Sequence, residues 1–224
     1  MQISIIIPVL NEAVLLPEAL RRLGPFAVRG AEIIVVDGGS SDGSAQIAGQ
    51  AGLRVLRTQR GRARQMNAGA AAAHGDVYLF LHADTTLPAD ALDRVQEALR
   101  EGARAWGRFD VALEGDGVVL ALVAWLINLR SRLTGIATGD QAMFVTRRAF
   151  RALGGFPDQP LMEDVELSRR LLSRSRPACL RERVVTSARR WQDRGTLRTI
   201  LLMWRLRWLY WRGRPADELV REYR

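Results

Sequence analysis

Short polar segments carry the side chains of this sequence that are best suited to chemistry, and each one follows an apolar run or a tight turn. Three of them are Pro-Val-Leu-Asn-Glu at 8–12, Asp-Gly-Gly-Ser-Ser-Asp at 37–42 and His-Ala-Asp at 82–84. A fourth, with Glu163 and Asp164, follows a Gly-Gly-Phe-Pro turn. Carboxylates bind hard divalent cations and act as general bases. The sequence therefore predicts metal-assisted or acid–base chemistry where these segments meet.

Asp37 is the most informative residue of the second segment. It ends a β-branched run and precedes two glycines, which let a backbone approach a ligand closely. Turn formation and helix capping account for Asp42 and Ser44. They account less well for Asp37, which has no evident capping task at the end of a strand. We therefore interpret Asp37, with Gly38, as a contact to a base or ribose.

His82 and Asp84 lie two residues apart, on the same side of an extended chain. Asp84 is suited to a cation whose other ligands are phosphate oxygens and water, as in many magnesium sites. The alternative is a capping aspartate ahead of Leu87. For Glu163 and Asp164 the alternative is favourable charge at a helix start, and the functional interpretation is a general base.

The scaffold for these segments is predicted by alternating apolar runs and helical periodicity. Unbroken apolar runs are typical of strands buried on both faces, and strands separated by helices indicate a parallel sheet covered on both sides. Such sheets bind ligands at the carboxyl ends of their strands, where the polar segments lie. We predict strands at 3–7, 32–36, 53–56 and 77–81, and helices at 12–23, 44–50, 62–73 and 89–101.

The second half of the sequence is less regular. We predict strands at 104–113, 141–145 and 184–187, and helices at 118–133, 147–153, 163–173 and 196–212. The apolar run 118–129 is shorter than a membrane-spanning helix needs, and we interpret it as a buried or dimer-forming helix. In the last helix, Trp204, Trp208 and Trp211 share one side with Leu201. Packing on the core is the favoured interpretation, and contact with a membrane surface is the alternative.

Composition narrows the class of protein. The 224 residues carry a net charge of +9, and all 33 basic residues are arginine. The absence of lysine excludes a Walker-type phosphate loop and a Schiff-base enzyme. Arginine suits phosphate binding, but charge alone does not choose between nucleotide, nucleic acid and membrane. A single cysteine fits a reducing compartment, so we expect a cytoplasmic protein. We interpret residues 1–10 as a buried strand and not a signal peptide.

Taken in order, the segments at 5–12, 35–44, 80–84 and 154–157 closely resemble the family 2 glycosyltransferases, over about residues 1–190. The resemblance implies an α/β GT-A fold, with a Rossmann-like mixed sheet flanked by helices and a C-terminal helical extension. It implies a glycosyltransferase domain at 1–190, with a nucleotide-sugar-binding half (1–115) and an acceptor half (116–190), followed by a helical extension at 191–224.

The resemblance also implies the chemistry: transfer of a hexosyl-type sugar from a UDP- or GDP-linked donor to a hydroxyl acceptor, with inversion and with Mg²⁺ or Mn²⁺. Asp84 would bind the metal, and Asp164 would be the base with Glu163 beside it. The acceptor is a small molecule or a lipid-linked one, and no nucleic acid is expected. The residues implied to bind the donor are Pro8, Leu10, Asn11, Glu12, Asp37, Gly38, His82, Ala83 and Asp84.

Two positions depart from the family pattern. His82 replaces the first carboxylate of the Asp-x-Asp motif, and Met66 replaces the arginine that usually precedes Asn67. We therefore add Arg62, Arg64 and Asn67 as donor contacts. Both departures resemble a small bacterial subgroup associated with arsenosugar-type pathways. Two further segments of that subgroup are predicted to lie on the diphosphate or acceptor side: Gly139, Asp140 and Gln141, then Arg189, Arg190 and Trp191.

Three other functions compete with this one. A sugar-nucleotide pyrophosphorylase should carry a Gly-rich loop with Arg and Lys after the first strand, which this sequence lacks. A basic nucleic-acid-binding protein fits the charge, but the chain shows no recognised binding motif. A catalytically inactive nucleotide-binding module is suggested by His82. A homodimer and peripheral contact at the inner membrane face complete the expectations.

Overall fold

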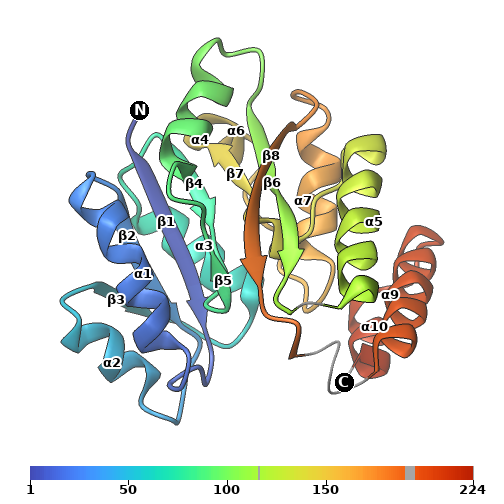
Figure 1. Ribbon diagram of the computed structural model, residues 1–224, viewed down its shortest axis with the longest axis horizontal. Coiled ribbons are helices and arrows are strands. Elements are labelled where there is room, and N and C mark those ends of the chain that lie inside the picture. Colours follow the sequence, from blue (N-terminus) through green and yellow to red (C-terminus); the bar gives the residue numbers. More distant parts are fainter. Residues whose placement is uncertain (116, 190–194, 224) are drawn as a thin grey trace.

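The computed structural model describes residues 1–115, 117–189 and 195–223, and a mixed sheet runs through its middle (Figure 1). Within the described residues the strand order is β3-β2-β1-β4-β7-β6-β8-β5. The strands are β1 (Ile3–Val9), β2 (Glu32–Asp37), β3 (Arg54–Arg57), β4 (Val77–Phe80), β5 (Thr85–Thr86), β6 (Trp106–Leu113), β7 (Phe144–Thr146) and β8 (Ala178–Thr186).

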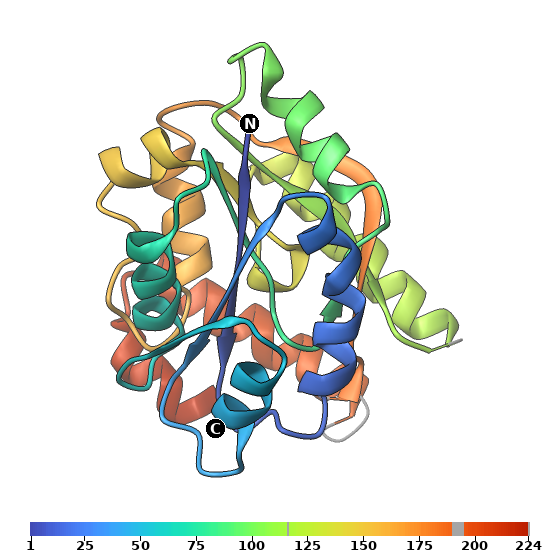
Figure 2. The same ribbon diagram turned by 90° about the vertical axis from the view of Figure 1, so that its left-hand side faces the viewer.

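Helices cover both faces of this sheet. Figure 2 shows β1 between α1 and α4 on one side and α3 on the other. The described helices are α1 (Leu16–Val28), α2 (Ser44–Gln50), α3 (Arg62–Ala72), α4 (Ala91–Arg100), α5 (Val118–Thr134), the 3₁₀ turn η1 (Gly139–Gln141), α6 (Arg147–Ala152), α7 (Glu163–Leu171), α9 (Thr196–Trp211) and α10 (Ala216–Tyr223). The predicted mixed sheet flanked by helices is confirmed.

Side-chain alternation along β1 builds two hydrophobic cores. Ile3, Ile5 and Ile7 pack with the apolar faces of α1 and α4, whereas Ile6 packs with α3 and α6. Successive side chains of a strand point to opposite faces, so a strand with two buried faces is mostly apolar. This is why Ile5, Ile6 and Ile7 follow one another in β1, whose buried Ser4 donates a hydrogen bond to Glu32.

The N-terminal half of the sheet is parallel, as predicted. β1 pairs in parallel with β2 and β4, and β2 with β3. The carboxyl ends of β1, β2 and β4 therefore meet at one edge. Gln65 of α3 joins two of them, because its amide nitrogen donates to the carbonyls of Val9 and Val36 at 2.8 Å each.

The second half differs from the prediction at several strands. β7 is antiparallel to both β4 and β6. It begins at Phe144 instead of residue 141, because Thr138 and Gln141 form a capping box that folds residues 139–141 into η1. β8 is longer than predicted because it pairs with most of β6. β5 was not predicted, and α10 was not predicted as a separate helix of the C-terminal extension.

The interpretation of 118–129 as a buried helix is wrong. α5 buries only a narrow side, at Val123, Ala124 and Ser131. Its opposite side leaves large apolar residues open to solvent, with exposed fractions of 85% for Val118 and 57% for Trp125. When all sides of a helix are apolar, the sequence does not show which side packs against the rest of the protein.

α9 packs on the core through the side opposite its tryptophans. Leu206 is fully buried in a cluster with Leu161 and Met162, and Leu219 of α10 completes it. Burying a leucine contributes about 1.5–3 kcal/mol. The packing interpretation holds for this side, while the tryptophan side faces outward, as the exposed fraction of 80% for Trp211 shows.

Close packing of α3 on β1 yields a stability prediction. A methyl group at Gly69 would lie 2.4 Å from Cγ2 of Ile6, so Gly69→Ala should lower the free energy of unfolding by about 1–3 kcal/mol. Gly49 of α2 has nothing within 4 Å of the corresponding position, so Gly49→Ala should raise it by about 0.5–1 kcal/mol through helix propensity. Urea unfolding followed by circular dichroism measures both. Equal effects of the two substitutions would contradict the packing argument.

Candidate active site

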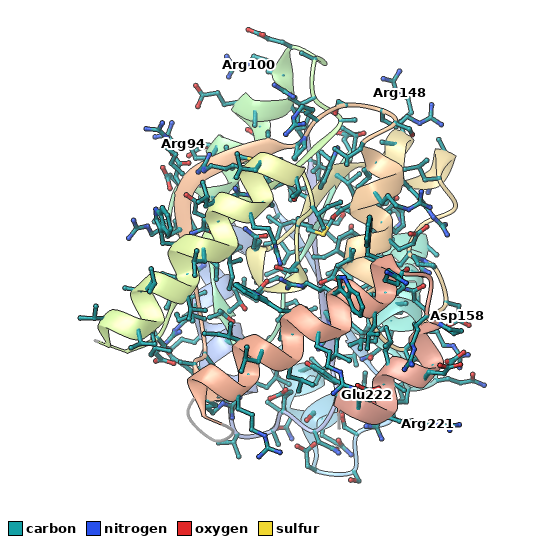
Figure 3. The ribbon with its side chains drawn as sticks, turned by 90° about the vertical axis from the view of Figure 1, so that its right-hand side faces the viewer. Arg94, Arg100, Arg148, Asp158, Arg221 and Glu222 are labelled. Atoms are coloured by element: carbon teal, nitrogen blue, oxygen red, sulfur yellow. The ribbon has the colours of Figure 1, made fainter. Side chains whose placement is uncertain are left out.

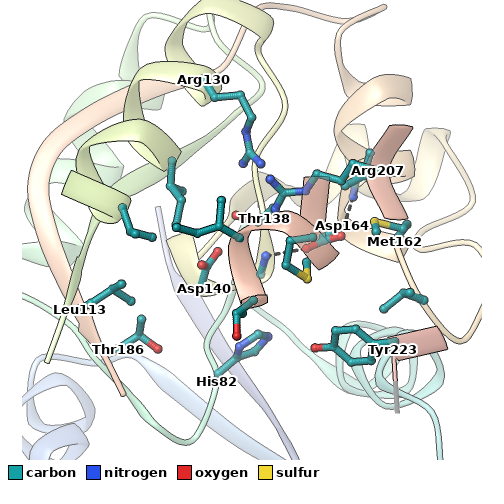
Figure 4. Close-up of a pocket in the computed structure, with 18 of the residues that line it drawn as sticks. His82, Leu113, Arg130, Thr138, Asp140, Met162, Asp164, Thr186, Arg207 and Tyr223 are labelled. Carbon is teal, nitrogen blue, oxygen red and sulfur yellow. Dashed lines mark hydrogen bonds between the residues drawn. The ribbon is translucent and has the colours of Figure 1, made fainter. Parts of the chain in front are cut away.

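A cavity of about 850 Å³ lies at the carboxyl edge of the sheet, and residues of α5, α7 and α9 form its other walls (Figure 4). Parallel β1 and β4 deliver two of the polar segments to it, and α7 brings the third. The residues predicted from the sequence that line it are Pro8, Glu12, Arg62, His82, Ala83, Asp84, Gly139, Asp140, Glu163, Asp164 and Arg189.

Asp164 stands in the first turn of α7 and is fixed by two backbone groups. Its Oδ2 accepts from the N–H of Gly139 at 2.7 Å, and its Oδ1 from the N–H of Val165 at 2.7 Å. Burial, and then the neighbouring charge of Glu163, raise the pKa of Asp164 to about 6. A carboxylate with that pKa is suited to accept a proton near neutral pH.

Gly139 lies next to the side chains of both His82 and Asp164. A side chain at position 139 would meet Nε2 of His82 at 2.7 Å and Oδ2 of Asp164 at 3.7 Å. Only glycine fits between the two groups without displacing one of them. The chain therefore places the imidazole of His82 beside the proposed base.

The backbone that precedes Glu163 is held in an unusual conformation. Met162 has φ of 63° and is buried, a left-handed conformation that few residues other than glycine adopt. The α7 helix starts directly after it, which turns Glu163 inward to an exposed fraction of 3%. The positive end of α7 therefore faces the cavity.

Arg62 provides positive charge close to several carboxylates of the cavity. Its Nη1 lies 3.5 Å from Oε1 of Glu163, and Asp164 and Asp84 also act on its charge. Burial, and then the charge of Asp84, raise the pKa of Glu12. Glu12 and Asp84 therefore face the same space, and Nη2 of Arg189 lies 4.0 Å from Oε2 of Glu12.

Asp37 does not line the cavity, and the argument that it has no capping task is wrong. Its side chain is 2% exposed and accepts from the N–H of Gly39 at 3.1 Å and of Ser40 at 3.2 Å. Gly38 is packed against the amide of Gln65. Both residues shape the turn after β2.

Five other candidates are held outside the lining of the cavity. Asn11 accepts from the N–H of Ser41 in the adjoining turn, and Leu10 precedes it. Arg64 pairs with Asp158 at 2.8 Å. The amide of Asn67 donates to and accepts from the backbone of Phe156, so it fixes the Gly-Gly-Phe-Pro turn. Gln141 is buried in its capping box. Arg190 and Trp191 lie outside the described residues.

Sequence reasoning missed the part of the cavity wall that comes from α5, α9 and α10. Arg130 lies at the end of an apolar run, Arg207 within a helix rich in arginine, and Tyr223 near the last residue. Nothing in the local sequence distinguishes these side chains from surface residues. Only the tertiary arrangement of α5, α9 and α10 brings them to the cavity.

Comparison with known proteins agrees with this architecture. The model of the family "Glycosyl transferase family 2" matches residues 4–150. The undecaprenyl-phosphate 4-deoxy-4-formamido-L-arabinose transferase of Pseudomonas aeruginosa PAO1 is 31% identical over 161 residues, which cover 66% of this chain and 47% of that protein. Its counterpart in Klebsiella pneumoniae strain 342 is 33% identical over 67% of this chain and 49% of its own length. The chain thus spans about half the length of these curated relatives.

Solved structures share the fold at lower identity. The mannosyltransferase PcManGT from Pyrobaculum calidifontis, in complex with GDP-Man and Mn²⁺, is 20% identical with a TM-score of 0.67, over 92% of this chain and 60% of that one. TarS 1–349 from S. aureus, in complex with UDP-GlcNAc, is 19% identical with a TM-score of 0.66, over 84% and 58%. The family model covers well over half of the residues, and the fold agrees: the chain belongs to glycosyl transferase family 2.

Proposed function

We propose that the chain is an inverting, metal-dependent glycosyltransferase that moves a hexosyl-type sugar from a UDP- or GDP-linked donor to a hydroxyl acceptor. The observation that carries this proposal is the cavity that Asp84 and Asp164 share, where Asp84 follows β4 and Asp164 has a raised pKa. The donors named for PcManGT and TarS support a nucleotide sugar.

Transfer then takes a single displacement. Asp164 accepts the proton of the acceptor hydroxyl while its oxygen forms a bond to the anomeric carbon. The bond from that carbon to the diphosphate breaks on the opposite side, and the nucleoside diphosphate leaves. Attack opposite the leaving group inverts the anomeric centre, and the base contributes about 10²–10⁴-fold to the rate.

Asp84 is the residue that would hold Mg²⁺ or Mn²⁺, and the ion would compensate charge on the leaving diphosphate. Within the described residues no three His, Cys, Asp or Glu side chains gather as a metal site. One carboxylate with nearby His82 fits a cation that arrives with the donor and keeps phosphate and water ligands. Arg62 and Arg189 lie close enough to add positive charge.

We assign the donor's base and ribose to the edge of the cavity at the end of β1. Pro8 and Glu12 line that edge. Asp37 would act there through the turn that it caps. An inactive nucleotide-binding module remains the competing function, because His82 replaces a carboxylate, and the following experiment separates the two.

Two substitutions should divide donor binding from transfer. The parent protein should melt at a higher temperature with UDP or GDP and manganese than with the nucleotide alone, since a ligand of the native state stabilises it. Asp84→Ala should abolish this difference. Asp164→Asn should keep the difference and lose about 10²–10⁴-fold in transfer rate. Thermal shift and a product assay measure the two effects. Normal transfer by Asp164→Asn would assign the base elsewhere, and binding without turnover in the parent protein would favour the inactive module.

The pKa of Asp164 sets the pH dependence of transfer. An aspartate whose pKa is raised to about 6 is mostly protonated below that pH and cannot serve as a base there. We expect kcat/KM to fall about tenfold per pH unit below pH ~6 and to level off above it. Donor binding by thermal shift over the same range is the control. A flat profile down to pH ~4 would indicate a base with an ordinary aspartate pKa.

An acceptor at a membrane surface is supported by the outer sides of α5 and α9, which lie side by side (Figure 3). Trp125 of α5, and Trp204, Trp208 and Trp211 of α9, are between 54% and 80% exposed. Aromatic and aliphatic side chains interspersed with arginine are typical of helices at a bilayer surface. No described helix is long and apolar enough to cross a bilayer. We propose peripheral contact and a lipid-linked acceptor, as the names of the curated relatives suggest.

Vesicle flotation tests this contact. The parent protein should float with anionic vesicles at low salt, and the double variant Trp208→Glu/Trp211→Glu should lose at least tenfold in bound fraction, because two apolar contacts are replaced by charge. Val28→Glu, at a site 90% exposed on α1, carries the same kind of change away from this surface and should float normally. A parent protein that stays with the unbound fraction contradicts the proposal.

A further inference from the structure

Two arginines from different helices converge in the cavity, and the mechanism above uses neither of them. Arg130 comes from the last turns of α5, and Arg207 from α9. Figure 4 shows both guanidinium groups pointing toward the same region near Thr138, while His82 lies on the other side of the cavity. The pair therefore stands away from the residues assigned to the donor.

Three guanidinium nitrogens of the pair lack partners among the described residues. Nε and Nη2 of Arg130 and Nε of Arg207 are shielded from solvent and make no hydrogen bond with the part of the chain that the structure describes. Nε and Nη2 form one edge of the guanidinium, and that edge binds both oxygens of a phosphate or carboxylate at once. Buried polar groups normally have partners, so unpaired donors in a cavity indicate a ligand that supplies the acceptors.

The charges nearby do not satisfy the pair. Burial lowers the pKa of Arg130, and Asp140 and Asp164 raise it only in part. Asp140 makes no ion pair with Arg130 among the described residues, and its Oδ1 also lacks a partner. Burial raises the pKa of Asp140. Two guanidinium groups that converge in a cavity without a paired carboxylate from the described part of the chain form an attractive site for an anion.

The wall around the pair is apolar. Leu126 and Leu133 of α5 and Met203 and Trp204 of α9 line the same cavity and lead to the exposed sides of both helices. Apolar side chains of α5 and α9, the two arginines and Asp164 therefore line one cavity. A ligand that contacts the pair can also reach Asp164.

We propose that Arg130 and Arg207 bind an anionic phosphate group of the acceptor and so position its hydroxyl at Asp164. This inference rests on the proposed function and adds the class of acceptor: a hydroxyl compound that carries a phosphate and an apolar portion. The phosphate is not consumed, since the hydroxyl oxygen forms the new bond and its proton passes to Asp164. The phosphate belongs either to a lipid headgroup or to a water-soluble molecule.

Binding of inorganic phosphate, measured by calorimetry with UDP or GDP and manganese present, tests the pair. Arg130→Gln and Arg207→Gln should each weaken phosphate binding about 10–100-fold, the loss expected for charge-assisted hydrogen bonds. Arg198→Gln removes the same charge from an exposed site on α9 and should bind phosphate as the parent does. All variants should keep nucleoside diphosphate affinity within about twofold, which also reports that they are folded.

Several outcomes would overturn the inference. Unchanged phosphate binding in Arg130→Gln and Arg207→Gln would show that the pair serves the fold alone. A parallel loss of nucleoside diphosphate affinity would assign the pair to the donor. If the parent protein bound no nucleoside diphosphate, the proposed function itself would fail, and phosphate binding measured without nucleotide would still test the pair separately.

Binding to two kinds of vesicle with equal negative charge distinguishes a lipid headgroup from a water-soluble phosphate. Phosphatidic acid exposes a phosphomonoester, whereas phosphatidylglycerol exposes only a diester. With a lipid headgroup as ligand, Arg130→Gln weakens binding to phosphatidic acid vesicles and leaves binding to phosphatidylglycerol vesicles unchanged. With a water-soluble ligand, the substitution affects inorganic phosphate alone. Either result supports a phosphate site, and an effect on neither probe removes it.

Discussion

One hydrogen bond ties the catalytic arrangement together: the backbone N–H of Gly139 donates to the carboxylate of Asp164 at 2.7 Å. It joins η1, which follows α5, to the start of α7, and the absence of a side chain at Gly139 admits His82 to the same point. The position of the proposed base thus depends on a loop, a helix end and the strand that delivers His82. The bond fixes the carboxylate, while burial and the charge of Glu163 raise its pKa to about 6, even though the bond itself lowers that pKa.

The cavity balances acidic groups with arginines and no lysine. Burial and the charge of Asp84 raise the pKa of Glu12, and Asp84 and Asp164 both act on the charge of Arg62, whose guanidinium lies beside Glu163. Arginine stays charged when it is partly buried, because its pKa is far above neutrality. The guanidinium of Arg62 therefore supplies a lasting positive charge to a site where several carboxylates and phosphates must come together. The fold places it on α3, at the N-terminal end of the helix that also clamps β1 to β2.

The part of the cavity at the ends of β1 and β4 could be predicted from the sequence, and the part formed by α5, α9 and α10 could not. Buried parallel strands have a distinctive composition, and the residues after them must meet at one edge, so the positions of Glu12 and Asp84 followed from local patterns. Asp37 shows the limit: its position was right, but its hydrogen bonds to its own turn depend on dihedral angles that the sequence does not specify. Arg130 and Arg207 reach the cavity only through the packing of α5 and α9. Strand pairing fixes which strand ends meet at one edge, but no comparable rule fixes which sides of two helices face a cavity.

The boundary of the family match has a consequence for how related chains diversify. Residues 4–150 hold the strands and helices that the family shares, whereas much of the opposite wall comes from residues 161–223. Under the proposed function, inheritance of the common segment would preserve how the donor is held, while drift in the remaining third would change part of the wall that faces the acceptor. Relatives that agree closely over their first 150 residues need not act on the same molecule, and swapping C-terminal segments between them is a route to new specificity.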